Sequence, residues 1–317
     1  MTRKASERHY FNADDVAAAL NVAQSELIAL GVPQTRWTVG TADFGHVSLR
    51  WGFHAVSSVA TGAVPADTAV LGVGSHTDTW TLNRMPYSER TAIFLPPRAD
   101  FVGAFSTPGN FCFLSAPYEW LLAQGDHEMH ERLDPRTIRT FDLGHAAAAR
   151  ARAGLVVARN FALHQDEFVE CPQHRATMEK SIVASFFGAL DSADEIVLRS
   201  DPRLARRLVE YLRAHPDEPL FQEDLTAALE TSRRSLRRVF ADHFGTSPGS
   251  YLRMRRMHLA RRALVRGDCA SVTEAAVRFG FFDLGRFAGT YKLMFGEIPS
   301  ETIRSGFSRR RAKRKMR

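Results

Sequence analysis

The sequence predicts an α+β protein of two domains, a β-rich N-terminal domain with helices and an all-α C-terminal domain. Its 317 residues exceed the length at which a single core usually stops growing. Short strand-like runs give way to helical periodicity from Pro202 onward. Residues 1–200 hold 17 Lys and Arg against 22 Asp and Glu, a net charge of −5, whereas residues 201–317 hold 25 against 13, a net charge of +12. A basic segment joined to an acidic one is typical of a polyanion-binding module attached to another domain.

The N-terminal domain is predicted to begin with a helix and to continue as a sheet. Residues 14–30 place Val16, Leu20 and Leu27 on one side of an amphipathic helix. From about residue 35 to residue 115, runs rich in Val, Thr, Phe and Trp alternate with Gly, Pro, Asn and Asp turns, which is typical of a small antiparallel sandwich or barrel. The predicted strands are 35–39, 45–51, 54–60, 68–73, 91–95, 100–105 and 111–114.

Two further helices are predicted at 146–157 and 173–190. The second carries an apolar stripe, which must be buried either on the sheet or against a second copy of the chain. The stripe consists of Met178, Ile182, Val183, Phe186, Phe187 and Leu190. The polar stretch after it places the domain boundary near 192–202. The predicted organisation is a first domain over 1–198, a helical domain over 199–306 and a basic disordered tail over 307–317.

All four tryptophans lie in or beside the predicted sheet. Aromatic side chains in such a region mostly fill a β core, because they dominate buried area. A pocket for a small molecule in the mouth of a barrel is the alternative. On that alternative, Trp37, Trp51 and His54 are the candidate ligand-binding residues.

The C-terminal domain contains an internal repeat. The run Phe-x3-Phe-Gly-x2-Pro at 240–248 recurs 51 residues later as Tyr-x3-Phe-Gly-x2-Pro at 291–299. In each unit a short helix, 223–229 or 273–278, precedes a turn and a second helix. Ser232 or Asp283 is the expected N-cap of that second helix, and a glycine ends it. This order is the helix-turn-helix arrangement, whose second helix enters the major groove of DNA.

Four arginines occupy the predicted exposed face of the first such helix. They are Arg233, Arg234, Arg237 and Arg238. A solvated helix face normally mixes positive and negative charges, so this face is better explained by a partner. Arginine binds guanine in a bidentate manner and clamps phosphate, which favours a DNA contact over a plain solvated face.

A stiff connector is predicted between the two units. Within 248–267 a helix of about 16 residues spans roughly 24 Å. Rigidity matters because two recognition helices can then meet successive turns of the major groove, about 34 Å apart. The basic tail 309–317 is expected to add non-specific attraction to phosphate.

The C-terminal residues resemble the AraC/XylS family of bacterial regulators. The resemblance rests on the run from Gly280-Phe281-Phe282-Asp283 through Gly296 to Pro299-Ser300, and it covers about 205–305. Leu284-Gly285-Arg286-Phe287-Ala288 and the segment 299–302 most resemble the branch that includes the ethanolamine operon activator. The family implies a seven-helix domain with two helix-turn-helix units, and an N-terminal sensor domain built as a small, cupin-like β-barrel with helices that often dimerise.

The resemblance also implies positions that read bases. These positions fall on Arg234, Arg237 and Arg238 in the first unit and on Gly285, Arg286 and Gly289 in the second. Because glycine has no side chain to read a base edge, the second unit is expected to grip the DNA backbone through Arg286 and Lys292. Glu230 stands where a glycine is common in the family, so the first turn is expected to differ in geometry.

The sequence predicts no enzyme activity, no cofactor and no metal site. His127 and His130 are three residues apart, whereas a helical zinc-protease motif needs a spacing of four. His46 and His54 are eight apart and lack a close pair of histidines. No glycine-rich phosphate loop or G-x-S-x-G motif is present. Spacing alone leaves a catalytic Cys/His pair open.

The expected function is a cytoplasmic, ligand-responsive transcription activator that binds double-stranded DNA. The N-terminus lacks an apolar signal segment, no stretch is long enough to span a membrane, and three widely spaced cysteines indicate no disulfide framework. Expected partners are RNA polymerase, a small-molecule effector and a second copy bound through the N-terminal domain. The alternatives are a regulator without a ligand and an enzyme domain fused to a DNA-binding module.

Overall fold

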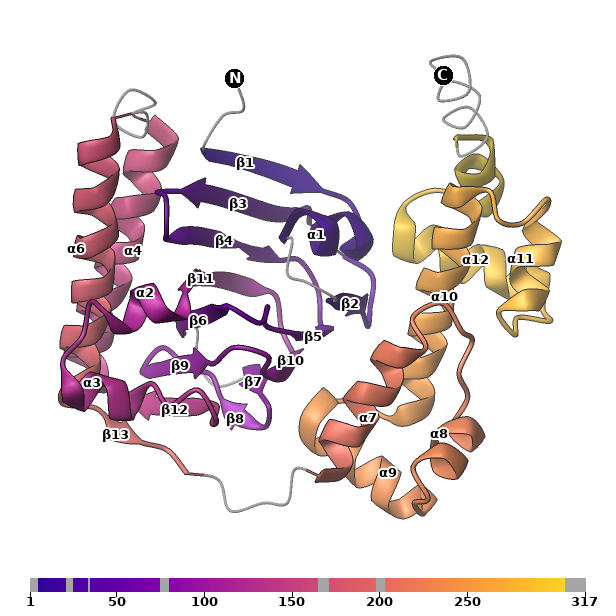
Figure 1. Ribbon diagram of the computed structural model, residues 1–317. Helices are drawn as coiled ribbons and strands as arrows, with labels where there is room; N and C mark the ends of the chain where they lie inside the picture. The colour runs from indigo at the N-terminus through magenta and orange to yellow at the C-terminus, as the bar shows by residue number, and fades with distance from the viewer. Residues whose placement is uncertain are drawn as a thin grey trace.

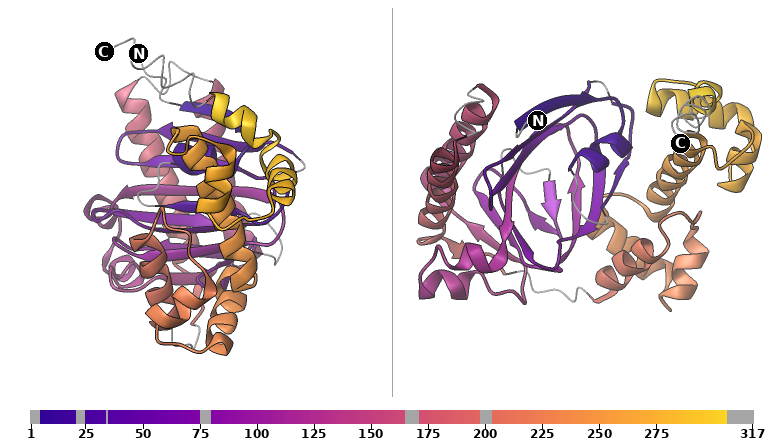
Figure 2. Two further views of the ribbon diagram at one scale, coloured as in Figure 1. Left: turned by 90° about the vertical axis from the view of Figure 1, so that its right-hand side faces the viewer. Right: turned by 45° about the horizontal axis from the view of Figure 1, so that its top comes forward.

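The N-terminal domain is an antiparallel β-barrel made of two facing sheets (Figures 1 and 2). The computed structural model describes residues 5–20, 25–33, 35–74, 80–164, 171–197 and 203–305. The larger sheet has the order β1-β3-β4-β11-β6-β9-β12-β13, and the smaller has the order β2-β5-β10-β7-β8. The strands of the larger sheet are β1 (Ala5–Tyr10), β3 (Trp37–Asp43), β4 (Ser48–His54), β6 (Thr68–Val73), β9 (Thr91–Leu95), β11 (Gly109–Pro117), β12 (Arg139–Asp142) and β13 (Asp194–Glu195). Those of the smaller are β2 (Glu26–Ala29), β5 (Ser58–Ala63), β7 (Trp80–Leu82), β8 (Met85–Pro86) and β10 (Asp100–Phe105).

One glycine shows how side-chain shape fixes the pairing of strands in the larger sheet. Gly40 on β3 lies opposite Trp51 on β4. A Cβ atom at Gly40 would lie 2.0 Å from the Trp51 ring, so only glycine leaves room for the indole. The indole Nε1 then donates a hydrogen bond of 2.6 Å to Glu7 Oε2 on β1. Three neighbouring strands are thereby tied together.

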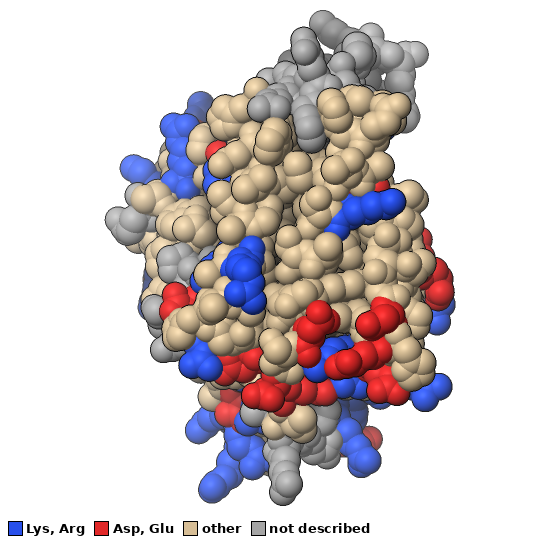
Figure 3. Space-filling view, turned by 90° about the vertical axis from the view of Figure 1, so that its left-hand side faces the viewer, with Lys and Arg blue, Asp and Glu red and all other residues tan. Residues whose placement is uncertain are grey.

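Helices cover the outer face of the larger sheet. They are α2 (Tyr118–Leu122), α3 (His127–Arg132), α4 (Gly144–His164) and α6 (Pro172–Leu190). The stripe predicted on 173–190 is buried in the core that these helices share with the larger sheet. The pair α4 and α6 stands on the side of the barrel away from the C-terminal domain (Figure 1). Seen from that side, the upper part of the surface is mostly uncharged and acidic side chains gather below it (Figure 3).

The C-terminal domain is helical and is organised around one long helix, α10 (Pro248–Arg266). The other elements are α7 (Arg203–Ala214), α8 (Gln222–Ala228), α9 (Arg233–Val239), the π-helical turn η1 (Phe240–Phe244), α11 (Val272–Arg278) and α12 (Leu284–Phe295). Helices α8 and α9 lie toward one end of α10, and α11 and α12 lie toward the other (Figure 1). The predicted repeat is therefore confirmed as two helical units joined by a helix.

The core of the C-terminal domain continues into the barrel. Ile28 on β2, Val59 on β5 and Val102 on β10 are buried in the same apolar cluster as the helices of the C-terminal domain, including Leu208 and Val209 of α7. The smaller sheet thus has two apolar faces, one toward the barrel interior and one toward the helices. Burial on both faces ties the two domains to each other.

Most of the predicted elements are present, and one prediction is wrong. Residues 14–30 do not form a single helix, because α1 (Ala13–Leu20) ends early and the chain resumes as β2. Strand β2 pairs with β5 and buries Leu27 and Ile28, and this non-local pairing overrides the helical pattern. In the described part of the chain, each helix is too short or too polar to cross a membrane.

Candidate nucleic-acid interface

The first helical unit presents an arginine-covered helix to solvent. Ser232 caps α9 as predicted, because its Oγ accepts a hydrogen bond of 3.1 Å from the Ser235 backbone N–H. Leu236 is fully buried and fixes the inner face of the helix. All four predicted arginines, Arg233, Arg234, Arg237 and Arg238, are exposed. Arg233 also pairs with Glu223 on α8 at 3.0 Å, an exposed contact that solvent weakens.

The second unit repeats this construction with a different surface. Asp283 caps α12, and its Oδ1 accepts from the Arg286 backbone N–H at 2.9 Å. Phe287 and Tyr291 are buried on the inner face. The predicted contact residues Gly285, Arg286 and Lys292, together with Gly289, are all exposed. The structure thus places each predicted DNA-contact residue on the open side of its helix.

The turn between α8 and α9 holds a strained residue. Glu230 has a φ of 48°, in the left-handed region that side chains other than glycine rarely adopt. The matching turn between α11 and α12 has Gly280 with a φ of 78°, where glycine carries no such penalty. The turn therefore needs a residue in the left-handed conformation. In the first unit Glu230 adopts this conformation in place of a glycine, which explains why a glycine is common at this position in the family.

Helix α10 is a suitable rigid connector for the two units. Its N-cap is Ser247, whose Oγ accepts from the Ser250 backbone N–H, and it ends at Gly267 with a φ of 68°. Nineteen residues give a length of about 28 Å, slightly more than the sequence predicted. The guanidinium of Arg256 lies 4.0 Å from the Phe221 ring and 5.8 Å from the Phe281 ring, and so connects the two units across the helix.

Comparison with known proteins agrees with this geometry. The sequence family described as "Helix-turn-helix domain" matches residues 225–305. The probable thc operon regulatory protein of Rhodococcus erythropolis is 44% identical over 106 residues, which are 33% of this chain and 32% of that protein. The crystal structure of a probable AraC family transcriptional regulator from Rhodopseudomonas palustris is 36% identical and covers 33% of this chain and 97% of that one, with a TM-score of 0.29. The chain belongs to the AraC family.

The other relatives agree in the kind of protein that they name. XylDLEGF operon transcriptional activator 1 of Pseudomonas putida is 32% identical over 143 residues, or 44% of this chain and 43% of that protein. This AraC-family chain spans about a third to less than half of the length of these curated relatives. The matched relatives are named as regulators and activators, not as enzymes.

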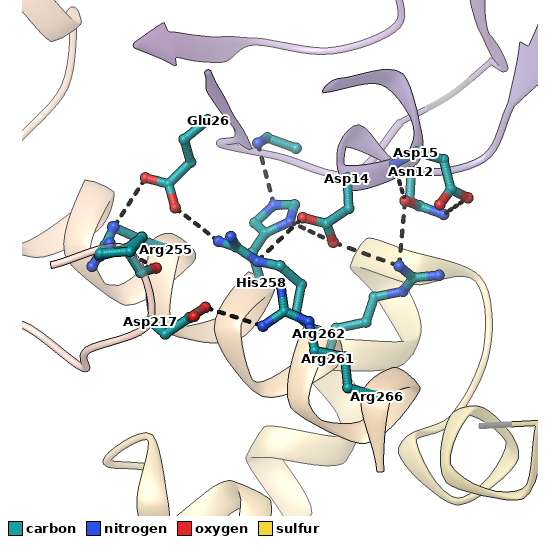
Figure 4. Close-up of polar contacts among 12 residues, drawn as sticks. Asn12, Asp14, Asp15, Glu26, Asp217, Arg255, His258, Arg261, Arg262 and Arg266 are labelled. Atoms are coloured by element: carbon teal, nitrogen blue, oxygen red, sulfur yellow. Dashed lines mark hydrogen bonds and ion pairs between the residues drawn. The ribbon is translucent and has the colours of Figure 1, made fainter. Parts of the chain in front are cut away.

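The barrel of this AraC-family protein is locked to α10 by buried charges, which the sequence did not reveal (Figure 4). Glu26 on β2 accepts from Arg255 Nε at 2.9 Å and from Arg262 Nη2 at 2.7 Å. Asp14 on α1 lies 3.4 Å from His258 Nδ1, and Nε2 of the same ring accepts from the Ala29 backbone N–H at 3.3 Å. We call Asp14, Glu26, Arg255, His258, Arg261 and Arg262 the interdomain network.

Electrostatics favours the charged forms of Asp14 and Arg262 in this network. Burial raises the pKa of Asp14, but the contacts with His258, Arg262 and Arg261 outweigh burial and leave that pKa below its ordinary value. Burial lowers the pKa of Arg262, but the nearby carboxylates of Glu26 and Asp14 outweigh the effect of burial and leave that pKa above its ordinary value. The Arg255 side chain is almost fully buried and also donates to the carbonyls of Glu218, His215 and Pro216. The Asp14 carboxylate and the Arg262 guanidinium are therefore charged in the folded chain.

An apolar cavity of about 130 Å³ lies inside the barrel. It is lined by side chains from α1 and from strands of both sheets, among them Leu20, Leu27, Val70, Trp80 and Phe105. Three titratable groups at its wall, His54, Cys112 and Tyr87, are uncharged near neutral pH. Burial lowers the pKa of His54 to about 3, raises that of Cys112 to about 12, and raises that of the Tyr87 hydroxyl. Glu26 of the interdomain network also borders the cavity.

The structure separates the three candidate ligand residues. His54 lines the cavity, stacks on Phe105 with ring centroids 4.1 Å apart, and lies 3.2 Å from the Ser58 hydroxyl. Trp37 is buried with its ring edge against His54 but does not line the cavity. Trp51 borders a separate, more polar hollow next to Arg159. Trp80, which the sequence does not single out, is the tryptophan that lines the cavity.

Histidines considered for a metal site lie in different surroundings. His46 stacks on Trp120 at 4.8 Å and lies near Glu179, whereas His54 is enclosed by aromatic rings. Among the residues that the structure describes, no three His, Cys, Asp or Glu side chains are grouped so that they could hold a metal ion.

Proposed function

We propose that this protein regulates transcription by inserting α9 and α12 into successive major grooves of one DNA duplex. The observation that carries the proposal is the pair of N-capped helices held at the two ends of α10, with basic side chains on their exposed faces. A length of about 28 Å for α10 is compatible with the roughly 34 Å between successive groove faces. The net charge of +12 over residues 201–317 supplies attraction to phosphate.

The test is selection of bound duplexes from random DNA with the full chain, followed by titrations at several salt concentrations. If Arg237 reads guanine, Arg237→Ala should weaken binding to the selected duplex by about 1–3 kcal/mol and relax the preference at one base pair. Lys292→Ala should weaken all duplexes alike, because a phosphate contact carries no sequence information. Equal, sequence-independent losses from both variants would contradict the assignment of roles.

We further propose that an uncharged, largely apolar small molecule in the barrel cavity is the effector. Apolar cavities of about 150 Å³ bind molecules of the size of benzene, and this cavity is similar in volume. Glu26 borders the cavity and holds Arg255 and Arg262 of α10, so a molecule placed against it can favour one arrangement of the interdomain network over another. A regulator without a ligand is the remaining alternative.

A thermal-shift screen of the full chain with small aromatic and aliphatic compounds tests the effector proposal. A ligand at about 100 times its dissociation constant should stabilise the chain by roughly 2.7 kcal/mol. Val70→Phe should fill part of the cavity and abolish that shift. A shift that persists in Val70→Phe would place the ligand elsewhere, and the absence of any shift would favour the ligand-independent regulator.

Several finer points belong to the same proposal. We also propose activation, contact with RNA polymerase and a cytoplasmic location; activation is supported by the name of the XylDLEGF operon transcriptional activator. A homodimer through α4 and α6 is supported by two exposed apolar residues of α4, Val156 and Val157. The upper part of the surface on this side of the molecule is also mostly uncharged (Figure 3). The predicted likeness to the ethanolamine operon activator rests on 284–288 and 299–302, whereas the matched relatives are named for other operons.

The proposed domains are a sensing and dimerisation domain over 1–198, a DNA-binding domain over 199–306 and a tail over 307–317, which lies outside the described residues. An enzymatic N-terminal domain is disfavoured because the reported relatives are named as regulators and activators, and because burial raises the pKa of the Cys112 thiol to about 12. A protonated thiol is a poor nucleophile.

A further inference from the structure

The internal repeat places opposite chemistry on the two recognition helices. From the N-caps onward, residues of α12 follow those of α9 by 51 positions, since Ser232 and Asp283 each accept from the backbone N–H three residues ahead. Residues that match at this offset therefore occupy the same place on their helices. Arg233, Arg234, Arg237 and Arg238 correspond to Leu284, Gly285, Ala288 and Gly289. Each guanidinium of the first face is replaced by an aliphatic side chain or by none.

The turn before α12 adds to this apolar surface. Glu230 and Gly280 are equivalent left-handed residues, yet one residue separates Glu230 from its N-cap and two separate Gly280 from its own. The second unit therefore carries an extra residue in its turn. Phe281 packs on Phe287 with ring centroids 5.2 Å apart, whereas Phe282, directly before the N-cap, is 81% exposed. Leu284, the first residue of α12, is 41% exposed.

Within the part of the chain that the structure describes, no neighbouring atom requires the two glycines of α12. A Cβ at Gly285 would meet only Asp283 Oδ1 at 3.6 Å, and a Cβ at Gly289 would meet nothing within 4 Å. Neither residue lies in the left-handed region. Glycine is nonetheless among the least favourable residues in a helix. The remaining explanation for glycine at these two positions is a partner molecule that approaches the helix surface closely.

We propose that the second unit recognises thymine methyl groups in the major groove through Phe282, Leu284 and Ala288. Thymine is the base that presents a 5-methyl group there, and apolar side chains contact it, whereas arginine pairs with guanine. Gly285 and Gly289 let α12 lie close to the base edges. The two recognition helices would thus read different bases, guanine with the first and thymine with the second.

This inference rests on the proposed function, and DNA is the occupant that the charges favour. Arg286 lies beside the apolar strip formed by Leu284, Ala288 and the two glycines, and Lys292 lies one turn further along the same face; both are exposed and can hold phosphates. A patch made for an apolar protein surface would be expected to lack an exposed lysine such as Lys292 on the same face, because lysine is depleted in protein interfaces.

The experiment replaces thymine by deoxyuridine, which pairs identically and lacks only the methyl group. The full chain is first used to select a duplex, and Arg237→Ala identifies the half-site bound by the first unit. Uridine in the other half-site should weaken binding about fourfold for each methyl group contacted, the value for burial of one methylene-sized group. Uridine in the first half-site should leave binding unchanged.

Variants separate this role from a structural one. The double variant Phe282→Ser, Leu284→Ala should bind the thymine and uridine duplexes equally. Leu293→Ala, an exposed aliphatic residue near the other end of α12, is the matched control and should keep the discrimination. Gly289→Ala should raise the melting temperature, because alanine favours helix, and yet lower the affinity for the selected duplex. If Gly289 had a purely internal role, Gly289→Ala would lower the melting temperature and would leave the affinity of the folded chain unchanged.

Three results would overturn the inference. Uridine in the second half-site could leave binding unchanged. The double variant could lose affinity for the thymine and uridine duplexes by the same factor. Alternatively, it could bind DNA normally and alter only self-association or recruitment of RNA polymerase, which would make the apolar strip a protein-docking surface. A chain that prefers no duplex over random competitor removes the proposed function itself, and the inference falls with it.

Discussion

Glu26→Gln is expected to weaken the attachment of the barrel to α10. The variant keeps the shape of the side chain but removes the charge that holds Arg255 and Arg262 at 2.9 and 2.7 Å. A hydrogen bond to a charged group contributes about 1.5–3 kcal/mol, and breaking a buried ion pair costs about 3–5 kcal/mol. Three features reduce this cost: Glu26 is 17% exposed, Arg255 keeps three carbonyl partners, and glutamine still accepts one hydrogen bond. We therefore expect the free energy of unfolding to fall by about 2–3 kcal/mol.

Urea unfolding followed by two signals measures this loss. All four tryptophans lie in the N-terminal 120 residues and report on the barrel, whereas circular dichroism is dominated by the helices. The wild-type signals should change together, because Ile28, Val59 and Val102 belong to the core of the C-terminal domain. In Glu26→Gln the part of the helical signal that comes from α7–α12 should change at lower urea than the fluorescence, whereas the part from α4 and α6 should change together with the fluorescence.

Asp217→Asn is the matched control, because Asp217 pairs with Arg266 on the same helix at 3.4 Å but in an exposed position. The stability of this control should change by less than about 0.5 kcal/mol. Coincident, unshifted transitions in Glu26→Gln would refute the reasoning that the interdomain network holds the two domains together.

Three further variants test other features. Glu230→Gly should raise the stability of the chain in thermal unfolding by about 1 kcal/mol, because glycine adopts the left-handed φ of this position without strain. Gly280→Ala should lower the stability for the same reason. An unchanged stability of Glu230→Gly would contradict the strain at this position. Asp14 has a pKa below 3.8 in the folded chain, so its contribution is complete above that pH and is lost as the pH falls through the folded value. The difference in stability between wild type and Asp14→Asn should therefore be constant from pH 5 to pH 7 and should shrink below about pH 4. Asp283→Ala should cost about 1 kcal/mol and lower DNA affinity as α12 frays, which circular dichroism and a binding titration would show; unchanged affinity would argue against α12 as a contact helix.

The helical domain could be predicted closely because its signals are local. Ser232 and Asp283 cap the helices that were expected, and Gly245 and Gly296 end them in left-handed conformations. Caps, glycines and a 3.6-residue period act within a few residues of chain, so the sequence displays them directly.

The barrel was predicted less well because strands depend on distant partners. Strand β1 contains Glu7 and Arg8 and carries no apolar alternation, and it is a strand because it pairs along β3. Strand β2 has a helical pattern and becomes a strand through pairing with β5. A pairing that joins residues 27 to 37 positions apart is not visible in a window of ten.

The interdomain network could not be predicted because buried and solvated charges look alike in a sequence. Helix α10 reads as a basic amphipathic connector, and nothing in it distinguishes the exposed Arg253 from the buried Arg255. The distinction arises when Glu26 and Asp14, more than 220 residues earlier, are brought against the helix. His54 was predicted at the cavity, whereas Trp80 was not preferred to Trp37, because only the strand order decides which ring faces the hollow.

The apolar cluster shared by the smaller sheet and the helices has a practical consequence for anyone who cuts the chain in two. A fragment beginning at α7 would lose Ile28, Val59 and Val102 as neighbours and would expose the side chains of Leu208 and Val209 that pack with them. Exposed apolar patches of this kind promote self-association. Weak or variable DNA binding by such a fragment would therefore reflect the exposed apolar surface of α7, and it would not show that the recognition helices bind DNA poorly.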